Sequence, residues 1–355
     1  MDKTFQIMDV TCRDGSYAIN FQLSTAAEKN ICCGLEALGF EYIEVGHGIG
    51  LGASRKNHGK ALHTDEEYLA CAQENLHKAQ YGVFCIPGVA DLEDVDLAAE
   101  YGCGFIRIGC NVEDIDKTEP YIKRAIAKGL TVMSNYMKSY ATPIQQFEEA
   151  VKKSEAWGAD LVYIVDSAGS MLPTDVERYY NAIKKISNIR TGFHGHDNIG
   201  MALANSIHAV ELGVDFIDAS LQGLGRSSGN TVMETLVICL QKMGYNFPID
   251  EIALLYLGRQ YVYPLMKGRG INPIDIECGA PGFHSSYLQD IHKISAQFEV
   301  DPLLLIRKYS KIDKVNMDVE KLAKIAKGLP GNKNSGYLLN MVDYFGGEQD
   351  SNNGG

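Results

Sequence analysis

Short hydrophobic runs alternate with amphipathic segments over the first 245 residues of the chain. The runs that predict strands are FQIMDVT, YIEVGHG, YGVFCIPG, GFIRIGC, TVMSNYM, DLVYIVDSAG, RTGFHGHDN and DFIDASLQG. They are too hydrophobic for a sheet with one face in water, which favours parallel strands covered by helices. Eight such units of strand and helix predict an α/β fold, a closed (β/α)8 TIM barrel. An open doubly wound sheet is the alternative.

The alternation stops after residue 245. The segments DEIALLYLGRQYVYPLM, SYLQDIHKISAQFEV and DVEKLAKIAKG have the pattern of helices. We therefore expect a catalytic barrel at 1–245 and a helical C-terminal region at 246–345. The ending GGEQDSNNGG is polar and rich in glycine, so 346–355 is expected to be a flexible tail.

Composition narrows the range of partners. The net charge is −12 and no long cluster of lysine or arginine occurs, which disfavours nucleic acid or an anionic membrane as partner. No apolar run approaches the roughly 18 residues of a transmembrane helix, and the N-terminus has no signal-peptide pattern. Nine cysteines without CxxC spacing indicate reduced thiols. A cytoplasmic protein with a small-molecule site is expected.

Polar residues with catalytic potential follow the predicted strands. Arg13 and Asp14 lie just after the first run, Ser167 lies toward the end of the sixth, and His194 and His196 lie toward the end of the seventh. Active sites of (β/α)8 barrels lie at the C-terminal ends of the strands, so these side chains are expected to converge.

His194 and His196 are two positions apart on one strand, so both rings point to the same face. With Asp14 from the first strand they could hold Mn²⁺, Mg²⁺, Co²⁺ or Zn²⁺ with positions left for substrate. The alternative is a histidine that caps the strand and another that is hydrogen-bonded in the core.

Three loops carry further candidates. Arg13, beside Asp14, could clamp a carboxylate or stabilise an enolate, or could form only a salt bridge at an Asp-Gly turn. The loop GLGRSSGNTVME lacks GxGxxG spacing, which disfavours NAD binding, and its Asn230 is expected to cap a helix or support the metal site. His47 lies in a glycine-rich loop that is either a lid or a long turn.

Several motifs together resemble the 4-hydroxy-2-oxovalerate aldolases, within the group of metal-dependent barrel enzymes that includes HMG-CoA lyase and isopropylmalate synthase. They are DVTCRDGS, IEVGHGIGL, HTD, YIVDSAGSM, HGHDNIGMALANSI, VDFIDASLQGLGRSSGN and GFHSSYL, in the same order from about residue 5 to 340. The resemblance implies a barrel followed by a helical region. It also implies cleavage of a 4-hydroxy-2-oxo acid to pyruvate and an aldehyde.

The resemblance also implies roles for particular residues. Asp14, His194 and His196 would bind the metal, most simply Mn²⁺. Arg13 would stabilise the pyruvate enolate, and Ser167 would help to bind substrate.

The chain departs from these aldolases at two positions. They carry a histidine as base three residues after the aspartate ligand and a tyrosine near the C-terminal region. This chain has Tyr17 and His284 there, as if the two residue types had been exchanged. An imidazole titrates near pH 6.5 and a phenol near 10, so His284 is the expected base and substrate contact, with Tyr17 as its hydrogen-bonding partner. The alternative is that the reaction is impaired or altered, with His47 the next candidate base.

Two other functions fit the same metal site. One is a Claisen-type synthase that condenses an acyl-CoA with a 2-oxo acid, and the other is a catalytically altered barrel subunit. The resemblance further suggests an acylating aldehyde dehydrogenase as partner, or a homo-oligomer.

Overall fold

The computed structural model describes residues 5–226, 228–266, 277, 281, 283, 288–312 and 317–331. The chain forms two compact units, residues 1–270 and 271–355. The predicted flexible tail at 346–355 lies outside the described residues, and so does His284.

The first unit is a closed barrel of eight parallel strands. The strands are β1 (Gln6–Asp9), β2 (Tyr42–Glu44), β3 (Gln80–Cys85), β4 (Phe105–Asn111), β5 (Thr131–Met137), β6 (Leu161–Asp166), β7 (Arg190–Gly195) and β8 (Phe216–Ala219). Each strand pairs with its neighbour in sequence, and β1 pairs with β8 to close the sheet. The predicted (β/α)8 barrel is confirmed, and the open sheet is excluded.

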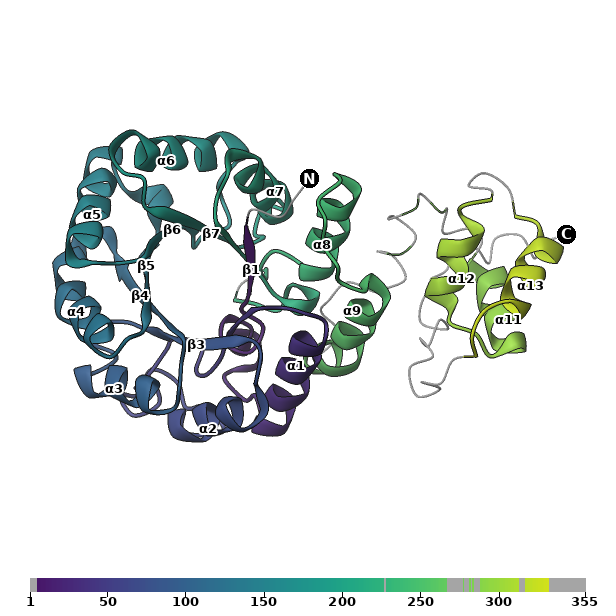
Figure 1. Ribbon diagram of the computed structural model, residues 1–355, viewed down its shortest axis with the longest axis horizontal. Coiled ribbons are helices and arrows are strands. Elements are labelled where there is room, and N and C mark those ends of the chain that lie inside the picture. The colour runs from purple at the N-terminus through teal and green to yellow at the C-terminus, as the bar shows by residue number, and fades with distance from the viewer. Residues whose placement is uncertain are drawn as a thin grey trace, which may run out of the picture. The chain divides into compact units, whose positions relative to one another are not determined.

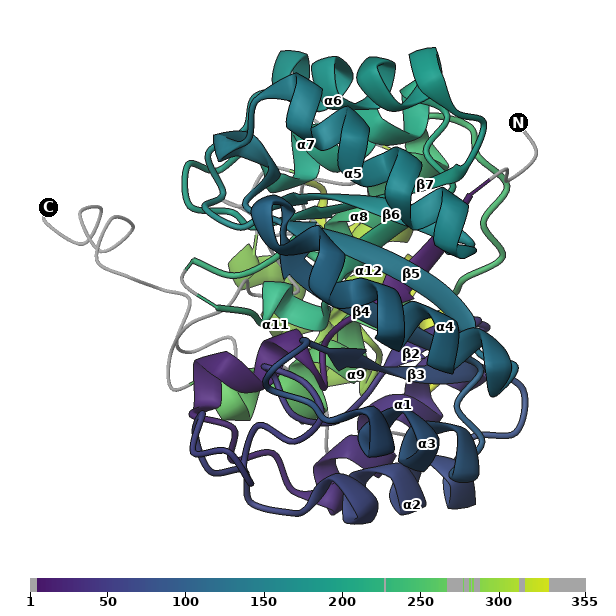
Figure 2. The same cartoon turned by 90° about the vertical axis from the view of Figure 1, so that its left-hand side faces the viewer.

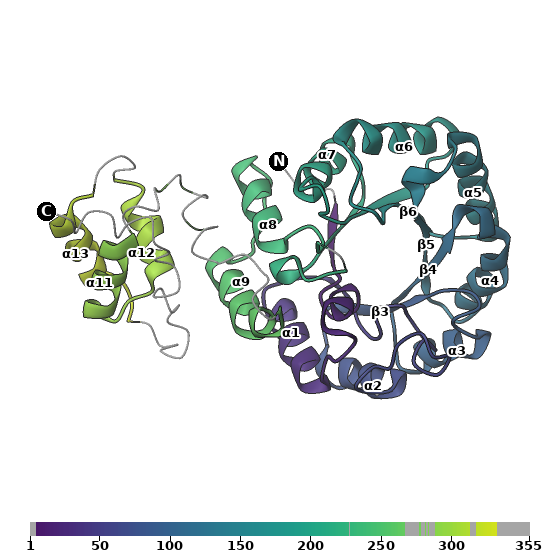
Figure 3. The same ribbon diagram turned by 180° about the vertical axis from the view of Figure 1, so that it is seen from behind.

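Helices surround the strands, as Figures 1 and 3 show. They are α1 (Thr25–Ala37), α2 (Asp65–Asn75), α3 (Leu92–Glu100), α4 (Glu119–Ala127), α5 (Ile144–Trp157), α6 (Pro173–Ile186), α7 (Ala202–Leu212) and α8 (Met233–Lys242). Local sequence determines several ends: Ser24 caps α1, and Thr64 forms a capping box with Glu67 at α2. The same unit contains α9 (Glu251–Leu257), which contacts α1 and α8. The first unit therefore extends beyond residue 245, where the sequence pattern changes.

Alternate residues of the strands face two different cores. Met8, Phe105 and Tyr163 belong to a cluster inside the barrel, whereas their neighbours Ile7 and Ile106 pack in the larger cluster with the helices. Because both faces of each strand are covered, the strands carry hydrophobic residues on both faces, as the sequence indicated. Figure 2 shows the strands crossing the barrel between the helices.

In the second unit the described helices are α11 (Leu288–Phe298), α12 (Pro302–Tyr309) and α13 (Val319–Lys327). Asp301 and Asp318 cap α12 and α13 by accepting hydrogen bonds from backbone N–H groups of the first turn. In the described part of the chain, no helix combines the length and hydropathy that crossing a bilayer requires.

Candidate active site

A pocket opens where the loops after several strands converge, and its floor is a carboxylate with two imidazoles. Asp14 begins the 3-10 helix η1 (Asp14–Ile19) in the loop that follows β1. His194 lies in β7, and His196 follows that strand directly. All three side chains line the pocket and are at least 95% buried. The barrel therefore brings together the three residues that the sequence suggested as metal ligands.

The ligand atoms of this triad lie close enough to share one ion. The Nε2 atoms of His194 and His196 are 3.3 Å apart, and His194 Nε2 is 4.0 Å from Asp14 Oδ2. One potential ligand atom from each residue lies within 4.8 Å of the others. Two nitrogens and one carboxylate oxygen form a donor set typical of a catalytic divalent metal.

Contacts on the far side of each imidazole determine which nitrogen carries the proton. His194 Nδ1 donates to Asp218 Oδ2 at 2.8 Å, and His196 Nδ1 donates to the Gly229 carbonyl at 3.2 Å, since both partners accept hydrogen bonds. In the neutral rings both Nε2 atoms then carry lone pairs, and these face each other. Burial lowers the pKa of His196 to about 4, so this ring is neutral near pH 7. A cation between the two nitrogens would relieve the repulsion of the lone pairs, so the residues fit a metal.

Asp14 is held in place from both sides. Its Oδ1 accepts a hydrogen bond of 3.0 Å from Asn230 Nδ2, and its Oδ2 is paired with Arg13 Nη1 at 2.8 Å. Burial opposes the charged form, but the Arg13 guanidinium outweighs it and holds the pKa of Asp14 well below its usual range. Asp14 is therefore anionic at neutral pH, and the hydrogen bond from Asn230 supports it.

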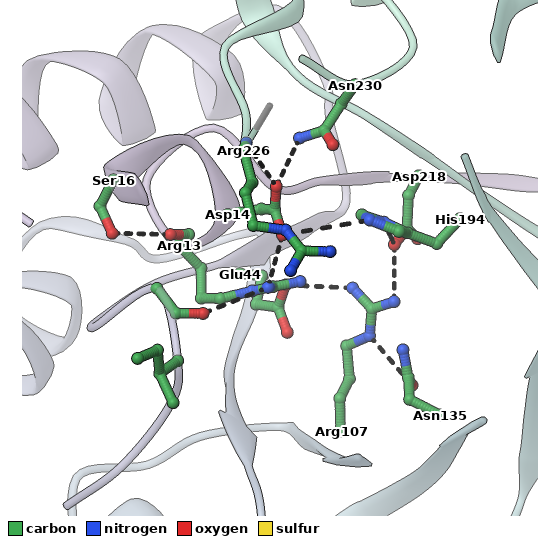
Figure 4. Close-up of polar contacts among 12 residues, drawn as sticks. Arg13, Asp14, Ser16, Glu44, Arg107, Asn135, His194, Asp218, Arg226 and Asn230 are labelled. Atoms are coloured by element: carbon green, nitrogen blue, oxygen red, sulfur yellow. Dashed lines mark hydrogen bonds and ion pairs between the residues drawn. The ribbon is translucent and has the colours of Figure 1, made fainter. Parts of the chain in front are cut away.

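A chain of buried ion pairs passes through the barrel interior and joins Asp14 to His194 (Figure 4). The pairs are Arg13 Nε with Glu44 Oε2 at 2.7 Å, Arg107 Nη1 with Glu44 Oε2 at 3.0 Å, and Arg107 Nη2 with Asp218 Oδ2 at 2.6 Å. Asp218 then meets His194. The network fixes the orientation of Asp14 at one end and of His194 at the other.

Arg13, Tyr17 and Ser167 line the same pocket. The Arg13 guanidinium lies 4.6 Å from the centre of the Phe84 ring, and its Nη2 takes part in none of the hydrogen bonds that the described residues make. The Ser167 hydroxyl accepts a hydrogen bond from the Lys138 backbone N–H at 3.0 Å. Burial raises the pKa of Tyr17, so its phenol is protonated at neutral pH.

His47 is held by backbone groups and does not line the pocket. Its Nδ1 accepts from the Ile49 N–H at 3.1 Å, and its Nε2 donates to the Gly59 carbonyl at 2.9 Å. The ring also stacks on Phe21, with a centroid distance of 4.3 Å. Both ring nitrogens of His47 are thus engaged by backbone groups of its own loop.

The sequence analysis missed Glu44, Arg107, Asp218 and Arg226. Glu44, Arg107 and Asp218 have a signal in the sequence, because each lies two positions after an aromatic residue of its strand that faces the barrel interior. A charged residue at such a position must find a buried partner. Arg226 has no comparable signal, since it lies in an irregular loop.

A family model and several proteins of known name match this chain over most of its length. Residues 4–259 match the model of the HMGL-like family. A 4-hydroxy-2-oxovalerate aldolase from Carboxydothermus hydrogenoformans is 33% identical over 92% of this chain and 97% of that protein. An oxaloacetate decarboxylase from Mycobacterium tuberculosis is 36% identical over 86% of this chain and 90% of that protein.

Solved structures agree with the fold. A hydroxymethylglutaryl-CoA lyase from Pseudomonas aeruginosa has a TM-score of 0.65 at 19% identity, covering 78% of this chain and 97% of that one. The carboxyl transferase domain of Rhizobium etli pyruvate carboxylase has a TM-score of 0.66 at 15% identity, covering 92% of this chain and 60% of that one. Given the match over most of its length to the family model and to the aldolases, the chain belongs to the HMGL-like family and, within it, to the 4-hydroxy-2-oxovalerate aldolase group.

Proposed function

We propose that this protein is a divalent-metal-dependent aldolase, a carbon–carbon lyase that cleaves a 4-hydroxy-2-oxo acid to pyruvate and an aldehyde or catalyses the reverse addition. The observation that carries the proposal is the meeting of Asp14, His194 and His196 with Arg13 at one pocket. The relatives named 4-hydroxy-2-oxovalerate aldolase, which match over most of the chain, support the same reaction.

The reaction requires stabilisation of a pyruvate enolate. A bound divalent ion would supply Lewis-acid polarisation of the 2-oxo group. When the C3–C4 bond breaks, its electron pair becomes the C2–C3 double bond, negative charge develops on the C2 oxygen, and C3 is protonated later. Arg13 would face that oxygen with Nη2, while its Nε and Nη1 stay paired with Glu44 and Asp14. Ser167, at the pocket wall, would orient the substrate.

Cleavage also requires a base that removes the proton of the 4-hydroxyl group. We assign this role to His284, with the Tyr17 phenol donating a hydrogen bond to the substrate oxygen. Support for the assignment comes from the apparent exchange of residue types and from the engagement of both His47 nitrogens. The protonated Tyr17 suits a donor better than a base.

Mn²⁺ is the proposed metal, with Mg²⁺, Co²⁺ and Zn²⁺ as the other candidates for two imidazoles and one carboxylate. An acylating aldehyde dehydrogenase that receives the aldehyde, or a second copy of the chain, is the proposed partner. A cytoplasmic location fits the described cysteines, all of which are free thiols.

Decarboxylation of oxaloacetate is the second candidate. It uses the same enolate, because loss of CO₂ leaves the C3–C4 electron pair in the C2–C3 double bond, and it requires no base for a 4-hydroxyl group. Tyr17 at the position of the family's base and the similarity to an oxaloacetate decarboxylase favour this candidate. The relatives do not favour the Claisen-type synthase, for which release of thiol from acetyl-CoA would be the distinguishing assay.

A pyruvate-release screen tests both reactions. The metal-free protein is reconstituted with Mn²⁺, and pyruvate is measured from 4-hydroxy-2-oxo acids of increasing chain length and from oxaloacetate. His196→Ala, treated in the same way, corrects for decarboxylation by free Mn²⁺. Pyruvate formed from a 4-hydroxy-2-oxo acid together with an equimolar aldehyde supports the aldolase. Release from oxaloacetate alone would replace it with the second candidate.

A further inference from the structure

Arg226 is a second arginine of the pocket that the reaction described above does not use. It lies in the loop between β8 and α8, and its side chain extends toward Asp14 and His194 (Figure 4). Arg226 lines the same pocket as Arg13 and the metal triad. A guanidinium in this position attracts any anionic group of a ligand that enters the pocket.

The loop presents Arg226 from a fixed backbone. The Arg226 carbonyl accepts a hydrogen bond of 3.0 Å from the Gly229 N–H, and the Arg226 N–H lies 3.5 Å from Asp14 Oδ1. Gly229 has a φ of +99°, and a Cβ there would lie 2.2 Å from the Gly223 carbonyl oxygen, so the tight turn requires glycine. The base of the Arg226 side chain is therefore held beside the triad.

The guanidinium of Arg226 has no carboxylate partner among the described residues. Its Nη2 donates to the Ser167 carbonyl at 2.9 Å, and its Cζ is 5.8 Å from the centre of the Tyr17 ring. The other two arginines of the site, Arg13 and Arg107, each pair with two buried carboxylates. Arg226 thus keeps most of its donors for a ligand, and its planar fork suits a carboxylate.

The charges of the site lead to the same conclusion. The three carboxylates Asp14, Glu44 and Asp218 exceed the charges of Arg13 and Arg107 by one. A divalent ion would leave one net positive charge, which the carboxylate of a simple 2-oxo acid neutralises. Arg226, which is solvent-exposed, adds a further positive charge with which a second anionic group of the substrate would pair.

We infer, on the basis of the proposed function, that Arg226 binds a second carboxylate of the substrate and selects dicarboxylic 2-oxo acids. The preferred substrates are those with a carboxylate at the end remote from the oxo acid group, such as 4-hydroxy-2-oxoglutarate, or oxaloacetate for decarboxylation. Both would place pyruvate on the metal side of the pocket and the second carboxylate at Arg226.

Binding of two unreactive acids tests the inference without turnover. 2-Oxoglutarate and 2-oxovalerate differ only by a carboxylate in place of a methyl group, and neither has the 4-hydroxyl group that cleavage requires. Calorimetric titration of the Mn²⁺-loaded protein should give roughly tenfold or tighter binding of 2-oxoglutarate, the range of a charge-assisted pair. In Arg226→Gln the ratio of the two dissociation constants should fall close to one, and in Arg226→Lys it should be intermediate.

The ratio separates ligand binding from a purely structural role. If Arg226 only braced the loop through the Ser167 carbonyl, its loss would weaken both acids equally and leave the ratio unchanged. Arg178→Gln is the matched control, since Arg178 lies exposed on α6 and pairs with Asp175. Measured Mn²⁺ content shows whether each variant keeps the metal. A wild-type ratio near one, an unchanged ratio in Arg226→Gln, or binding of neither acid would overturn the inference.

Cleavage assays separate this inference from the proposed function. The wild-type protein should have a higher kcat/KM for 4-hydroxy-2-oxoglutarate than for 4-hydroxy-2-oxovalerate, and Arg226→Gln should reduce that preference. Cleavage of both substrates without preference contradicts the role of Arg226 and leaves the aldolase intact. Absence of cleavage alongside a normal binding preference rejects the aldolase and keeps the role of Arg226.

Discussion

At the scale of single residues, the site depends on which atoms of His194 and His196 are already engaged. Asp218 accepts a hydrogen bond from His194 Nδ1, and the Gly229 carbonyl accepts one from His196 Nδ1. Both Nε2 atoms therefore face the space beside Asp14. Such contacts behind an imidazole orient a ligand before the metal arrives and increase its basicity. The proposed metal affinity therefore depends on three ligand side chains and on the groups behind them.

We expect His196→Ala to lose bound metal and activity together, because a site with two remaining ligands holds an ion poorly. Equilibrium dialysis with metal analysis measures the loss. Mn²⁺ at a hundred times its Kd should stabilise the wild-type protein by about 2.7 kcal/mol and have little effect on the variant. His208→Ala on α7 serves as control, since His208 lies outside the pocket beside Glu177 and Glu211. Full metal occupancy in His196→Ala would remove it from the ligand set.

The assignment of the base is tested by comparing His284→Ala with Tyr17→Phe. His284→Ala should lower kcat for aldol cleavage by about 10² or more, the usual contribution of a general base, and Tyr17→Phe should have a smaller effect. Steady-state kinetics on one 4-hydroxy-2-oxo acid measures both. Normal turnover of His284→Ala would move the base elsewhere. Oxaloacetate decarboxylation should be retained in His284→Ala, because that reaction removes no hydroxyl proton.

At the scale of elements, the strands explain how a hydrophobic barrel contains a polar site. In β2, β4 and β8 one aromatic and one charged residue face the barrel interior, and the residue between them faces the helices. Phe105 and Arg107 illustrate this, because both face the barrel interior two positions apart on β4. The end of the barrel nearer the strand starts is therefore packed with aromatic side chains, and the charges lie toward the active-site end.

Helix α1 buries a carboxyl group, which gives a pH-dependent stability. Glu28 is 1% exposed, and neither of its oxygens has a hydrogen-bond partner among the described residues. Burial raises the pKa of Glu28 well above its ordinary value of 4.5. The folded protein then holds a proton that the unfolded chain releases above pH 4.5, so the stability from this group decreases as pH rises through the folded pKa.

Glu28→Gln should therefore become more stable relative to the wild type as the pH rises. The difference should grow by up to about 1.4 kcal/mol per pH unit, the limit for one proton. Urea unfolding of both proteins at pH 5, 7 and 8.5 measures it. A difference that is equal at all three values would indicate that Glu28 has a similar pKa in the folded and unfolded states.

At the scale of the whole molecule, the ion-pair network depends on closure of the barrel. Arg107 on β4 joins Glu44 on β2 to Asp218 on β8, strands that are not neighbours in the sheet. These side chains meet only because the interior of a closed barrel brings opposite strands within reach. The fold thus supplies the support for His194 and Asp14 from the far wall of the barrel.

Arg107→Ala should destabilise the protein by about 3–5 kcal/mol, because it leaves the buried Asp218 carboxylate without its arginine and leaves Glu44 with Arg13 alone. Metal affinity should also fall by roughly 10- to 100-fold, since Asp218 and His194 lose their support. Chemical denaturation and metal titration measure the two effects. Arg124→Ala is the matched control: Arg124 pairs with Asp96 on the surface, where an ion pair contributes at most about 1 kcal/mol. Equal losses in the two variants would contradict the proposed role of the network.

The sequence by itself determined the closed barrel and the meeting of Asp14 with His194 and His196. Both follow from local rules: buried parallel strands are hydrophobic throughout, residues two apart on a strand share a face, and barrel loops gather at one end. The tertiary structure alone decided the partners of Arg13, the path of charges through Glu44 and Arg107, and the entry of Arg226 into the pocket. These contacts join residues far apart in the chain, so their geometry exists only after the strands have closed into the barrel and the β8 loop has packed against the β1 loop.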